Sequence, residues 1–537
     1  MTPRGGGDPG RSASSLTAQS ATVGLGLMFS RGLGFLRDIV IAARFGASRE
    51  TDAYLVSAQV PIVFDALLAG NGLYSAMLPS ATAAALSDDP NGKLAALVKN
   101  ATTFVLLVCG SVSLLGAFFA SQLVTMFGGG LAPQSHTVAS RLTMLTILSL
   151  PFISLTNVMW VALNTRGKFW GPAIALSFSN LAIMACALTL GPSIGIYALG
   201  VGLVAGSILQ VGSQFFQLWR DGVPIRLGID FKNLEFIGVL TNLWPLALSG
   251  VIAVLSPAVD NFVATFLPSG GVTVIRYAQG LTIPFSLLGV AISIAVLPRL
   301  SRAVATKDSD GIVNLLHRIV RFLGLTLFGA AAVLIVIRVP LVALAYHRGA
   351  FDSLAAHRTV EALAMYALAI PFASTYYFLL RALLAYMRIR ELIAINAAML
   401  VLNLVLDLAF LPSLAHAGIA LSSVCVQATY VLLAVLVLRR DLKVKGIGRT
   451  LLAPLAVNGA AAGLALWLSY GARGLLAGVF PNWNGGSLLT VQLAVLIPAY
   501  IGLSRLAGYC ELDWIRRSWS ELIRSLPGKE SGGVAGA

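Results

Sequence analysis

Long apolar runs, separated by short segments rich in glycine, proline and charged residues, recur along the whole chain. A helix that crosses the hydrocarbon core of a bilayer needs about 20 predominantly apolar residues. The pattern predicts fourteen membrane-spanning helices, each covering one such run. They lie near residues 20–45, 51–78, 95–127, 137–164, 168–190, 195–219, 236–267, 272–297, 312–346, 356–386, 389–411, 417–438, 448–471 and 486–508.

The composition narrows the class of protein. Of the 537 residues, 57% are hydrophobic and 11% are charged, whereas soluble domains carry about 25% charged residues. A soluble enzyme, a disordered chain and a disulfide scaffold are therefore excluded. The 4 cysteines show no CxxC spacing, so we expect neither a metal nor a redox cofactor. We predict an all-α polytopic membrane protein.

The placement of basic residues predicts the orientation of the chain. There are 37 Lys and Arg residues against 22 Asp and Glu, a net charge of +15. The basic residues gather in alternate loops, such as those holding Arg166 and Lys168 or Arg439 and Arg440, while loops such as LPSGG carry almost none. Cytoplasmic loops of membrane proteins show this excess of Lys and Arg. We therefore expect both termini in the cytoplasm.

The two halves of the chain share landmarks at a near-constant offset. Asp38 and Asp260 are 222 positions apart, and Asn180 and Asn403 are 223 apart. Six predicted helices fit within this offset, and an even number gives both halves the same orientation in the membrane. The repeat therefore predicts two six-helix lobes related by an axis along the membrane normal, with a site between them.

These patterns divide the chain into five parts. The N-lobe is expected in residues 19–222 and the C-lobe in 223–442, followed by two further helices in 443–509. The Gly-, Pro- and Ser-rich residues 1–18 are expected to form a disordered cytoplasmic N-terminus. Residues 510–537 are expected to form a cytoplasmic amphipathic tail.

Ionisable residues within the apolar runs are the first candidates for function, because a charge at the centre of a membrane helix costs at least about 2.5 kcal/mol on insertion scales. These residues are Arg31, Arg37, Asp38, Asp52, Asp65, Asp260, Arg276, Arg381 and Asp407. Guanidinium groups stay charged and bind phosphate oxygens in bidentate pairs. Arg31 and Arg37 therefore favour a water-filled cationic cavity that attracts an amphiphile with a diphosphate head.

The structural alternative is that charges pair within the protein. Arg37 and Asp38 are adjacent, and such pairs lock helices together; Asp260 is open to the same interpretation. Asp52 and Arg276 lie near a membrane interface, where a side chain reaches water at little cost. No HExxH or GK[ST] motif is present. We therefore expect a transporter, not an enzyme, that is driven by the membrane potential or by a coupling ion.

One segment carries a family resemblance. SRGLGFLRDIVIAARFGASRETDAYLVSAQVP resembles the first two helices of the MurJ/MviN family of lipid II flippases, within the multidrug/oligosaccharidyl-lipid/polysaccharide exporter superfamily. Further matches, in family order, are AMLPS, LNTRGKFWGPA, VDNFVATFLPSGGVTVIRYAQGL, HRGAF, NLVLDLAFLP and GIALSS. The resemblance covers about residues 20–510.

The resemblance implies two lobes and two C-terminal helices that shape a groove for a polyprenyl tail. Such a protein carries an undecaprenyl-diphosphate-linked saccharide, the peptidoglycan precursor lipid II, to the outer leaflet of the bacterial inner membrane by alternating access. The implied partners are this lipid-linked saccharide and the bilayer, without nucleic acid or nucleotide. Family arginines used for lipid II fall on Arg31 and Arg37, beside Asp38, and a family acidic residue falls on Asp52.

Two segments depart from the family pattern. The family has paired arginines where this chain has Asp65 and Ala66, and another arginine where it has Gln279 or Gly280, with Arg276 close by as a substitute. A flippase for another lipid-linked glycan, such as an exopolysaccharide repeat unit, therefore stays open, as does a regulatory pseudo-transporter. A drug/cation antiporter of the same superfamily would favour acidic cavity residues, and a glycan polymerase or ligase would need a large outer loop.

Overall fold

The computed structural model of the chain describes residues 9–223, 226–230, 232–306, 308–442, 447–480 and 484–508. Every regular element in these ranges is a helix, so the predicted all-α class is confirmed. In chain order they are α1 (Pro9–Phe45), α2 (Arg49–Leu68), α3 (Gly70–Ala85), α4 (Pro90–Phe118), α5 (Ala120–Phe127), α6 (Pro133–Thr146), the 3₁₀ helix η1 (Ile147–Ser149), α7 (Leu150–Thr165), α8 (Trp170–Thr189), α9 (Gly191–Ile194), α10 (Tyr197–Arg220), α11 (Leu234–Ala264), α12 (Gly271–Ala305), α13 (Ser309–Ala345), α14 (Ser353–Ala385), α15 (Ile389–Leu442), α16 (Ile447–Val479) and α17 (Gly485–Leu506).

Eleven helices in the described residues are long and apolar enough to cross a membrane. The predicted segments fall largely within helix, but the count of fourteen crossings stays a prediction. α15 illustrates why the two counts differ. Its apolar part, Arg390–Arg440, has 51 residues, which is about 76 Å of helix and more than twice the hydrocarbon thickness. Ala415, with φ 46° and ψ −121°, kinks α15 between the two predicted helices 389–411 and 417–438.

The start of α1 differs from the sequence-based expectation. The helix begins at Pro9, inside the segment 1–18 that was expected to be disordered. The last glycine of that segment is Gly10, so the residues after it contain none. Proline suits the first turn of a helix because its φ is already helical. Residues 1–8 and the predicted amphipathic tail 510–537 lie outside the described residues.

The second predicted helix is divided into α2 and α3. The division lies at Ala69, whose φ of −141° and ψ of −67° are not helical. Gly70 and Gly72 follow directly, and each glycine lowers helix propensity by about 1 kcal/mol relative to alanine. The Leu73 N–H still donates to the Ala69 carbonyl at 2.6 Å. The break therefore occurs within the span, and Asp65 lies one turn before it.

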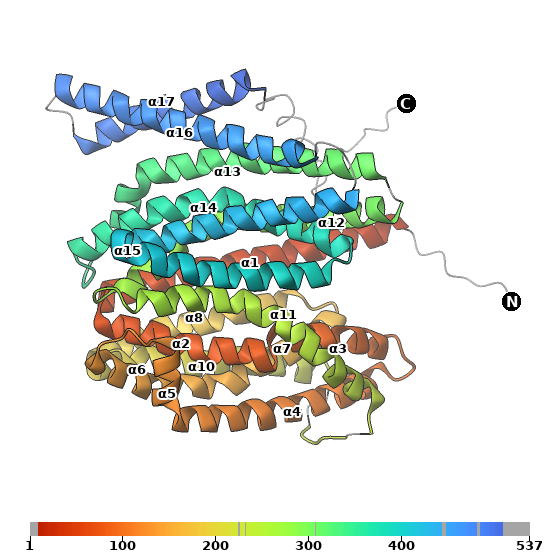
Figure 1. Ribbon diagram of the computed structural model, residues 1–537. Coiled ribbons are helices and arrows are strands. Elements are labelled where there is room, and N and C mark those ends of the chain that lie inside the picture. The colour runs from red at the N-terminus through yellow and green to blue at the C-terminus, as the bar shows by residue number, and fades with distance from the viewer. Residues whose placement is uncertain are drawn as a thin grey trace, which may run out of the picture.

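The helices form two lobes with α1 and α11 at their boundary (Figure 1). α2–α10 occupy the lower half of the view and α12–α15 the upper half, with α16 and α17 beside α13 at the outer edge. α1 packs mainly on α8, whereas α11 packs on both α3 and α15. α11 is therefore the helix that joins the two lobes along its length.

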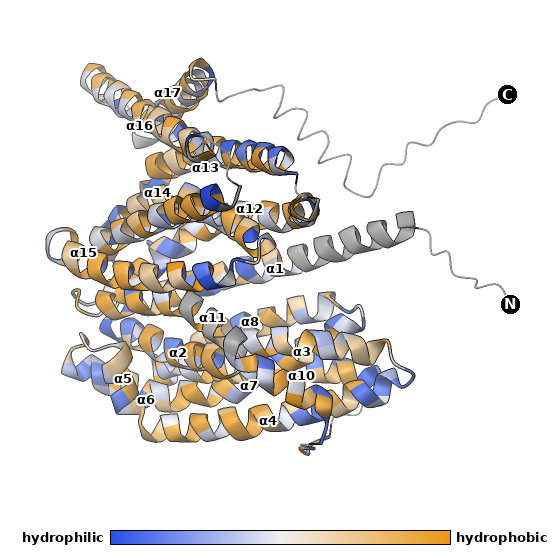
Figure 2. Ribbon diagram, turned by 45° about the vertical axis from the view of Figure 1, so that its right-hand side comes forward, coloured by the Kyte–Doolittle hydropathy of each residue, from blue (hydrophilic) through white to orange (hydrophobic). Residues whose placement is uncertain are grey.

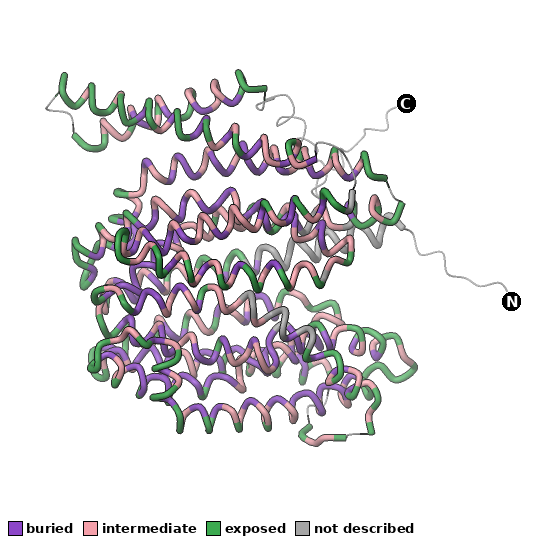
Figure 3. Tube along the Cα trace, in the orientation of Figure 1, coloured by how far each residue is buried: buried purple, intermediate pink, exposed green. Residues whose placement is uncertain are grey.

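Apolar residues cover the middles of the helices, and hydrophilic residues gather at their ends (Figure 2). The buried residues face neighbouring helices (Figure 3). One large core cluster, with Tyr277, Tyr346 and Phe351, fills the C-lobe and takes in Ala42 of α1. A second cluster, around Leu73, fills the N-lobe. Each lobe thus has its own core, and the polar residues between them are available for function.

Candidate functional site

A polar seam, formed by Arg37, Asp38 and Ser30 of α1 with Asn180 of α8, joins these two helices in the N-lobe. The Arg37 guanidinium pairs with the Asp38 carboxylate, with Nη2 2.7 Å and Nε 3.0 Å from Oδ1. Its other nitrogen, Nη1, donates to Asn180 Oδ1 at 3.0 Å, and the Asn180 amide donates to the Ser30 carbonyl at 3.2 Å. The Arg37 side chain keeps 21% exposure. The ion pair foreseen as the structural alternative is therefore present, and Arg37 still reaches the surface of the seam.

Residues from α2 and α12 surround this seam. Tyr54 on α2 interacts electrostatically with both Arg37 and Arg276. Arg276 is exposed although the residues on either side of it in α12 are buried. Tyr277 stacks on Tyr346 with ring centroids 4.7 Å apart. Arg37 from the N-lobe and Arg276 from the C-lobe are thus both within electrostatic range of one buried tyrosine.

Two other predicted arginines lie apart from this cluster. Arg31 is exposed on α1, and Arg381 is half-buried on α14. Within the described ranges neither makes a hydrogen bond or an ion pair. Their proposed roles rest on the sequence alone.

Asp52 links the N-lobe to the start of α12 in the C-lobe. Its carboxylate accepts the Gly270 N–H at 2.7 Å, the Thr273 N–H at 2.9 Å and the Thr273 hydroxyl at 2.7 Å. A carboxylate at this position satisfies free N–H groups of the first turn and complements the helix dipole. The side chain is 5% exposed. Asp52 therefore caps α12 across the boundary between the lobes, which the snorkelling interpretation did not foresee.

Further contacts close the lobes against each other at this same end. The Ala350 N–H donates to the Ala43 carbonyl at 2.9 Å, and the Gly130 N–H donates to the Thr265 hydroxyl at 3.0 Å. Gly349 has φ +63°, and a Cβ there would lie 2.1 Å from the Ala43 carbonyl oxygen. Any side chain would force the backbones apart. This end, which carries the loops poor in basic residues, is therefore closed.

The C-lobe has its own polar seam, between α11 and α15. The Asn403 amide donates to Asp260 at 3.0 Å and to Asp407 at 3.2 Å. Gln279 donates to Asp260 at 3.2 Å and to the Tyr366 hydroxyl at 3.0 Å. Asp260 and Asp407 thus share the Asn403 amide as a donor, and they are 6% and 0% exposed. Two buried carboxylates that share one amide donor repel each other unless a proton or a bound cation accompanies them.

Asp65 lies elsewhere, inside the N-lobe at the break between α2 and α3. It accepts the Ser154 hydroxyl at 2.6 Å, and the Cys109 thiol in turn donates to Ser154 at 3.5 Å. A Cβ on Gly70 would lie 3.5 Å from the carboxylate. Asp65 thus belongs to a small hydrogen-bonded group of its own, separate from Arg37 and Arg276. The described residues contain no cluster of three His, Cys, Asp or Glu side chains that suits a metal.

Sequence reasoning missed several members of these groups as site residues. Asn180 and Asn403 served only as landmarks of the repeat, yet each bonds the charged residue of its lobe. Their matching offset to Asp38 and Asp260 was the signal that could have found them. Tyr54 had no comparable signal, because its position depends on tertiary contacts between three helices.

Comparison with known proteins shows the family of the chain. The sequence model of a family described as lipid II flippase MurJ matches residues 41–491. The chain belongs to the MurJ family. The lipid II flippase MurJ of Burkholderia cenocepacia is 30% identical over 405 residues, covering 74% of this chain and 78% of the relative. The probable lipid II flippase MurJ of Rhizobium meliloti is 27% identical over 535 residues, covering 94% and 96%.

Solved structures show the same fold. A structure titled lipid II flippase MurJ, inward closed conformation, superposes with a TM-score of 0.73 at 23% identity, covering 90% of this chain and 98% of that one. An inward-facing multidrug MATE transporter of the MOP superfamily superposes with a TM-score of 0.64 at 12% identity, covering 78% and 96%. The chain is thus a multi-pass membrane protein with the fold of this superfamily.

Proposed function

We propose that the protein translocates an undecaprenyl-diphosphate-linked saccharide, lipid II in the simplest case, from the inner to the outer leaflet by alternating access. One observation supports this above all. Arg37 and Arg276, from different lobes, are both within electrostatic range of the buried Tyr54. Two guanidinium groups match the charge and the oxygen geometry of a diphosphate.

In this proposal the ion pair between Arg37 and Asp38 prepares the arginine. Asp38 holds the guanidinium through Nε and Nη2, and Asn180 holds Nη1. The side chain is therefore fixed before cargo arrives, and less conformational entropy is lost on binding. Arg276 would approach or leave the diphosphate as the C-lobe moves.

The closed end of the molecule supports alternating access. Asp52 and the Gly349 contact hold the lobes together on the side with few basic residues. We propose that this side is the outer face and that both termini lie in the cytoplasm, in keeping with the distribution of basic residues. Transport then requires Asp52 to release the start of α12.

We propose that the C-lobe seam supplies the driving force. The pair formed by Asp260 and Asp407 needs a proton or a small monovalent cation between its carboxyl groups. Taking up that ion from one side of the membrane and releasing it on the other couples transport to an ion gradient. The membrane potential adds about 2.3 kcal/mol per charge per 100 mV.

Asp65 supports a second candidate cargo. A carboxylate at the α2–α3 break is suited to an amino or hydroxyl group on the cargo more than to a phosphate. Another lipid-linked glycan, such as an exopolysaccharide repeat unit, is therefore the alternative. The family membership favours lipid II.

A leaflet-accessibility assay in proteoliposomes tests the proposal. Arg37→Ala and Arg276→Ala should each lower the rate of lipid II translocation by about tenfold to a hundredfold, the value of a charge-assisted hydrogen bond. Arg44→Ala, at the end of the same helix, is the matched control and should transport normally. If both variants move lipid II at the wild-type rate, the diphosphate is held elsewhere. If the wild-type protein moves another lipid-linked glycan but not lipid II, the alternative cargo is correct.

A further inference from the structure

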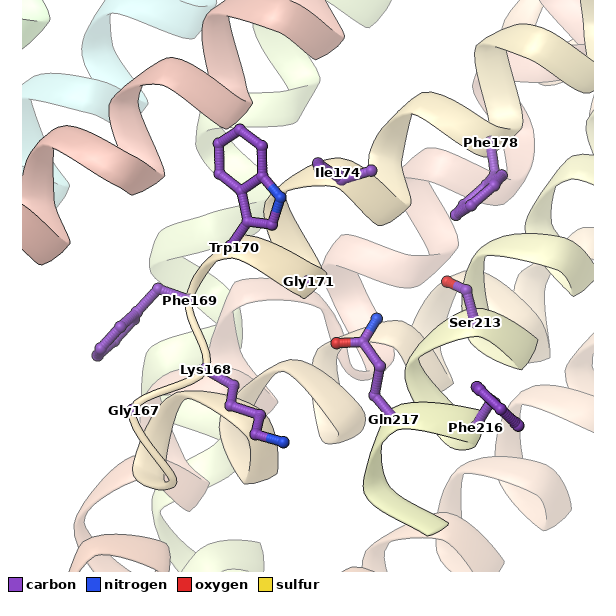
Figure 4. Close-up of a pocket in the computed structure, with 10 residues that line it drawn as sticks. All are labelled: Gly167, Lys168, Phe169, Trp170, Gly171, Ile174, Phe178, Ser213, Phe216 and Gln217. Carbon is purple, nitrogen blue, oxygen red and sulfur yellow. The ribbon is translucent and has the colours of Figure 1, made fainter. Parts of the chain in front are cut away.

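A pocket of about 610 Å³ opens between the first turns of α8 and the last turns of α10. Figure 4 shows Phe178, Ser213 and Phe216 along one side and Lys168 and Gln217 at the base. The pocket faces away from the α1–α8 seam, because Phe178 and Asn180 are two residues apart and point to nearly opposite sides of the helix. It is therefore separate from the proposed cargo site.

The pocket opens onto a surface that suits acyl chains. Along α8 the strip continues through Leu181 and Leu188, which are 44% and 61% exposed, and along α10 through Leu209 and Phe215, at 54% and 43%. A protein surface with this many exposed apolar residues is expected to contact lipid acyl chains rather than water. The pocket is thus a recess in the lipid-facing wall of the N-lobe.

Aromatic and basic residues mark the depth of the pocket in the membrane. Trp170 and Trp219 lie at the ends of α8 and α10, 49% and 62% exposed, as is typical of residues at the level of lipid head groups. The Lys168 side chain is 49% exposed, and its ammonium group bonds the Asp221 carboxylate. Arg220 is exposed and makes no ion pair within the described ranges. This end of the pocket thus has two basic side chains, Lys168 on its lining and Arg220 one turn beyond Gln217, against the single carboxylate of Asp221.

We infer that the pocket binds one anionic phospholipid of the leaflet next to the basic loops. Its phosphate lies between Lys168 and Arg220, and one acyl chain crosses Phe178 and Phe216. Basic pockets between membrane helices bind anionic head groups in this way. A zwitterionic lipid fits less well, because its ammonium group would meet the same two basic side chains. The inference needs the proposed orientation of the chain but not its proposed cargo.

Native mass spectrometry of the full-length protein, with dioleoyl phosphatidylglycerol and dioleoyl phosphatidylcholine in equal amounts, tests the inference. The wild-type protein should retain one phosphatidylglycerol in preference to phosphatidylcholine. Lys168→Gln and Arg220→Gln should each reduce that preference about fivefold, the effect of one basic residue near a membrane surface. Both residues are exposed, so these variants should fold.

Filling the recess is the complementary test. Ser213→Phe places a ring inside the pocket and should abolish the retained lipid. Gly212→Phe is the matched control, since a Cβ at Gly212 meets nothing within 4 Å, and it should retain phosphatidylglycerol. Equal retention by Ser213→Phe and wild type would overturn the inference. So would loss of the bound phosphatidylglycerol on adding an equal amount of undecaprenyl phosphate, because the pocket would then belong to the cargo lipid.

Discussion

The seam between α1 and α8 and the seam between α11 and α15 are equivalent in the repeat but differ in charge. In the N-lobe, Asn180 bonds an arginine that is already paired with Asp38. In the C-lobe, Asn403 bonds Asp260 and Asp407, and no basic side chain among the described residues is hydrogen-bonded to either. The first seam holds a guanidinium group balanced by one carboxylate, while the second holds two carboxylates and requires a proton or cation. The equivalent helix pairs of the two lobes therefore have different proposed roles.

The two seams also differ in how far their charged side chains are exposed. The Arg37 side chain is 21% exposed, whereas Asp407 is fully buried. The first seam therefore keeps part of its guanidinium-bearing side chain exposed, whereas the second keeps none of the Asp407 side chain exposed. This supports cargo binding by the N-lobe and coupling by the C-lobe.

The largest effect should come from removing Arg37 while keeping the fold intact. Arg37→Ala leaves Asp38 buried without a partner, so the single variant loses stability as well as transport. The double variant Arg37→Ala with Asp38→Asn should recover thermal stability but should still transport at least about tenfold more slowly than wild type. Recovery of transport in the double variant would mean that Arg37 serves only to neutralise Asp38.

Asp407→Asn should remove the dependence of lipid transport on an ion gradient without stopping the exchange of lipid between leaflets. The asparagine amide can donate a hydrogen bond to Asp260, and it removes the need for a shared proton or cation. We expect the variant to exchange lipid between leaflets without responding to an imposed proton or sodium gradient. Glu361→Gln, an exposed acid on α14, is the control and should respond as wild type does. An unchanged response of Asp407→Asn would remove the C-lobe seam from the mechanism.

Asp52→Ala should favour opening of the outer face. The loss of a helix cap costs about 0.5–2 kcal/mol, which shifts a two-state equilibrium by roughly 2- to 30-fold. Spin labels on Gln134 and Ser269, exposed residues of opposite lobes, should report a larger population of long distances. Asp52→Asn, which still accepts hydrogen bonds, should shift it less. Identical distance distributions in all three proteins would contradict the role of Asp52 in closure.

Asp65→Asn should have the smallest effect. The amide oxygen still accepts the Ser154 hydroxyl, so we expect a loss of unfolding free energy of no more than about 1 kcal/mol. Transport of lipid II should change less than in any variant above, since Asp65 does not touch the arginines. A large gain in lipid II transport would instead indicate that Asp65 selects against that cargo. Thermal unfolding and the leaflet assay measure the two quantities.

The sequence predicted the helices and the repeat well, because both depend on local patterns. Apolar runs gave the helical segments, and matched landmarks placed Asn180 and Asn403 at equivalent positions. The break at Ala69 was missed, since a single glycine-rich step within an apolar run does not change the hydrophobic pattern. The kink at Ala415 was foreseen as a loop between two helices.

The site was harder to predict than the fold. Arg37 and Asp38 are adjacent in the chain, so their pairing was an evident alternative. The partners of Asp52 lie 218 and 221 positions away in sequence, and nothing local indicates a contact between lobes. The position of Tyr54 between Arg37 and Arg276 likewise depends on how α1, α2 and α12 pack.

The most direct test is the affinity of the protein for a diphosphate lipid. It shows whether the N-lobe seam binds the cargo while the C-lobe seam binds only the coupling ion. We would measure the dissociation constant of undecaprenyl diphosphate for the detergent-solubilised wild-type protein, for the double variant Arg37→Ala with Asp38→Asn, and for Asp407→Asn. The account predicts at least about tenfold weaker binding in the double variant and wild-type affinity in Asp407→Asn. Wild-type affinity in the double variant, or equal weakening in both, would contradict it.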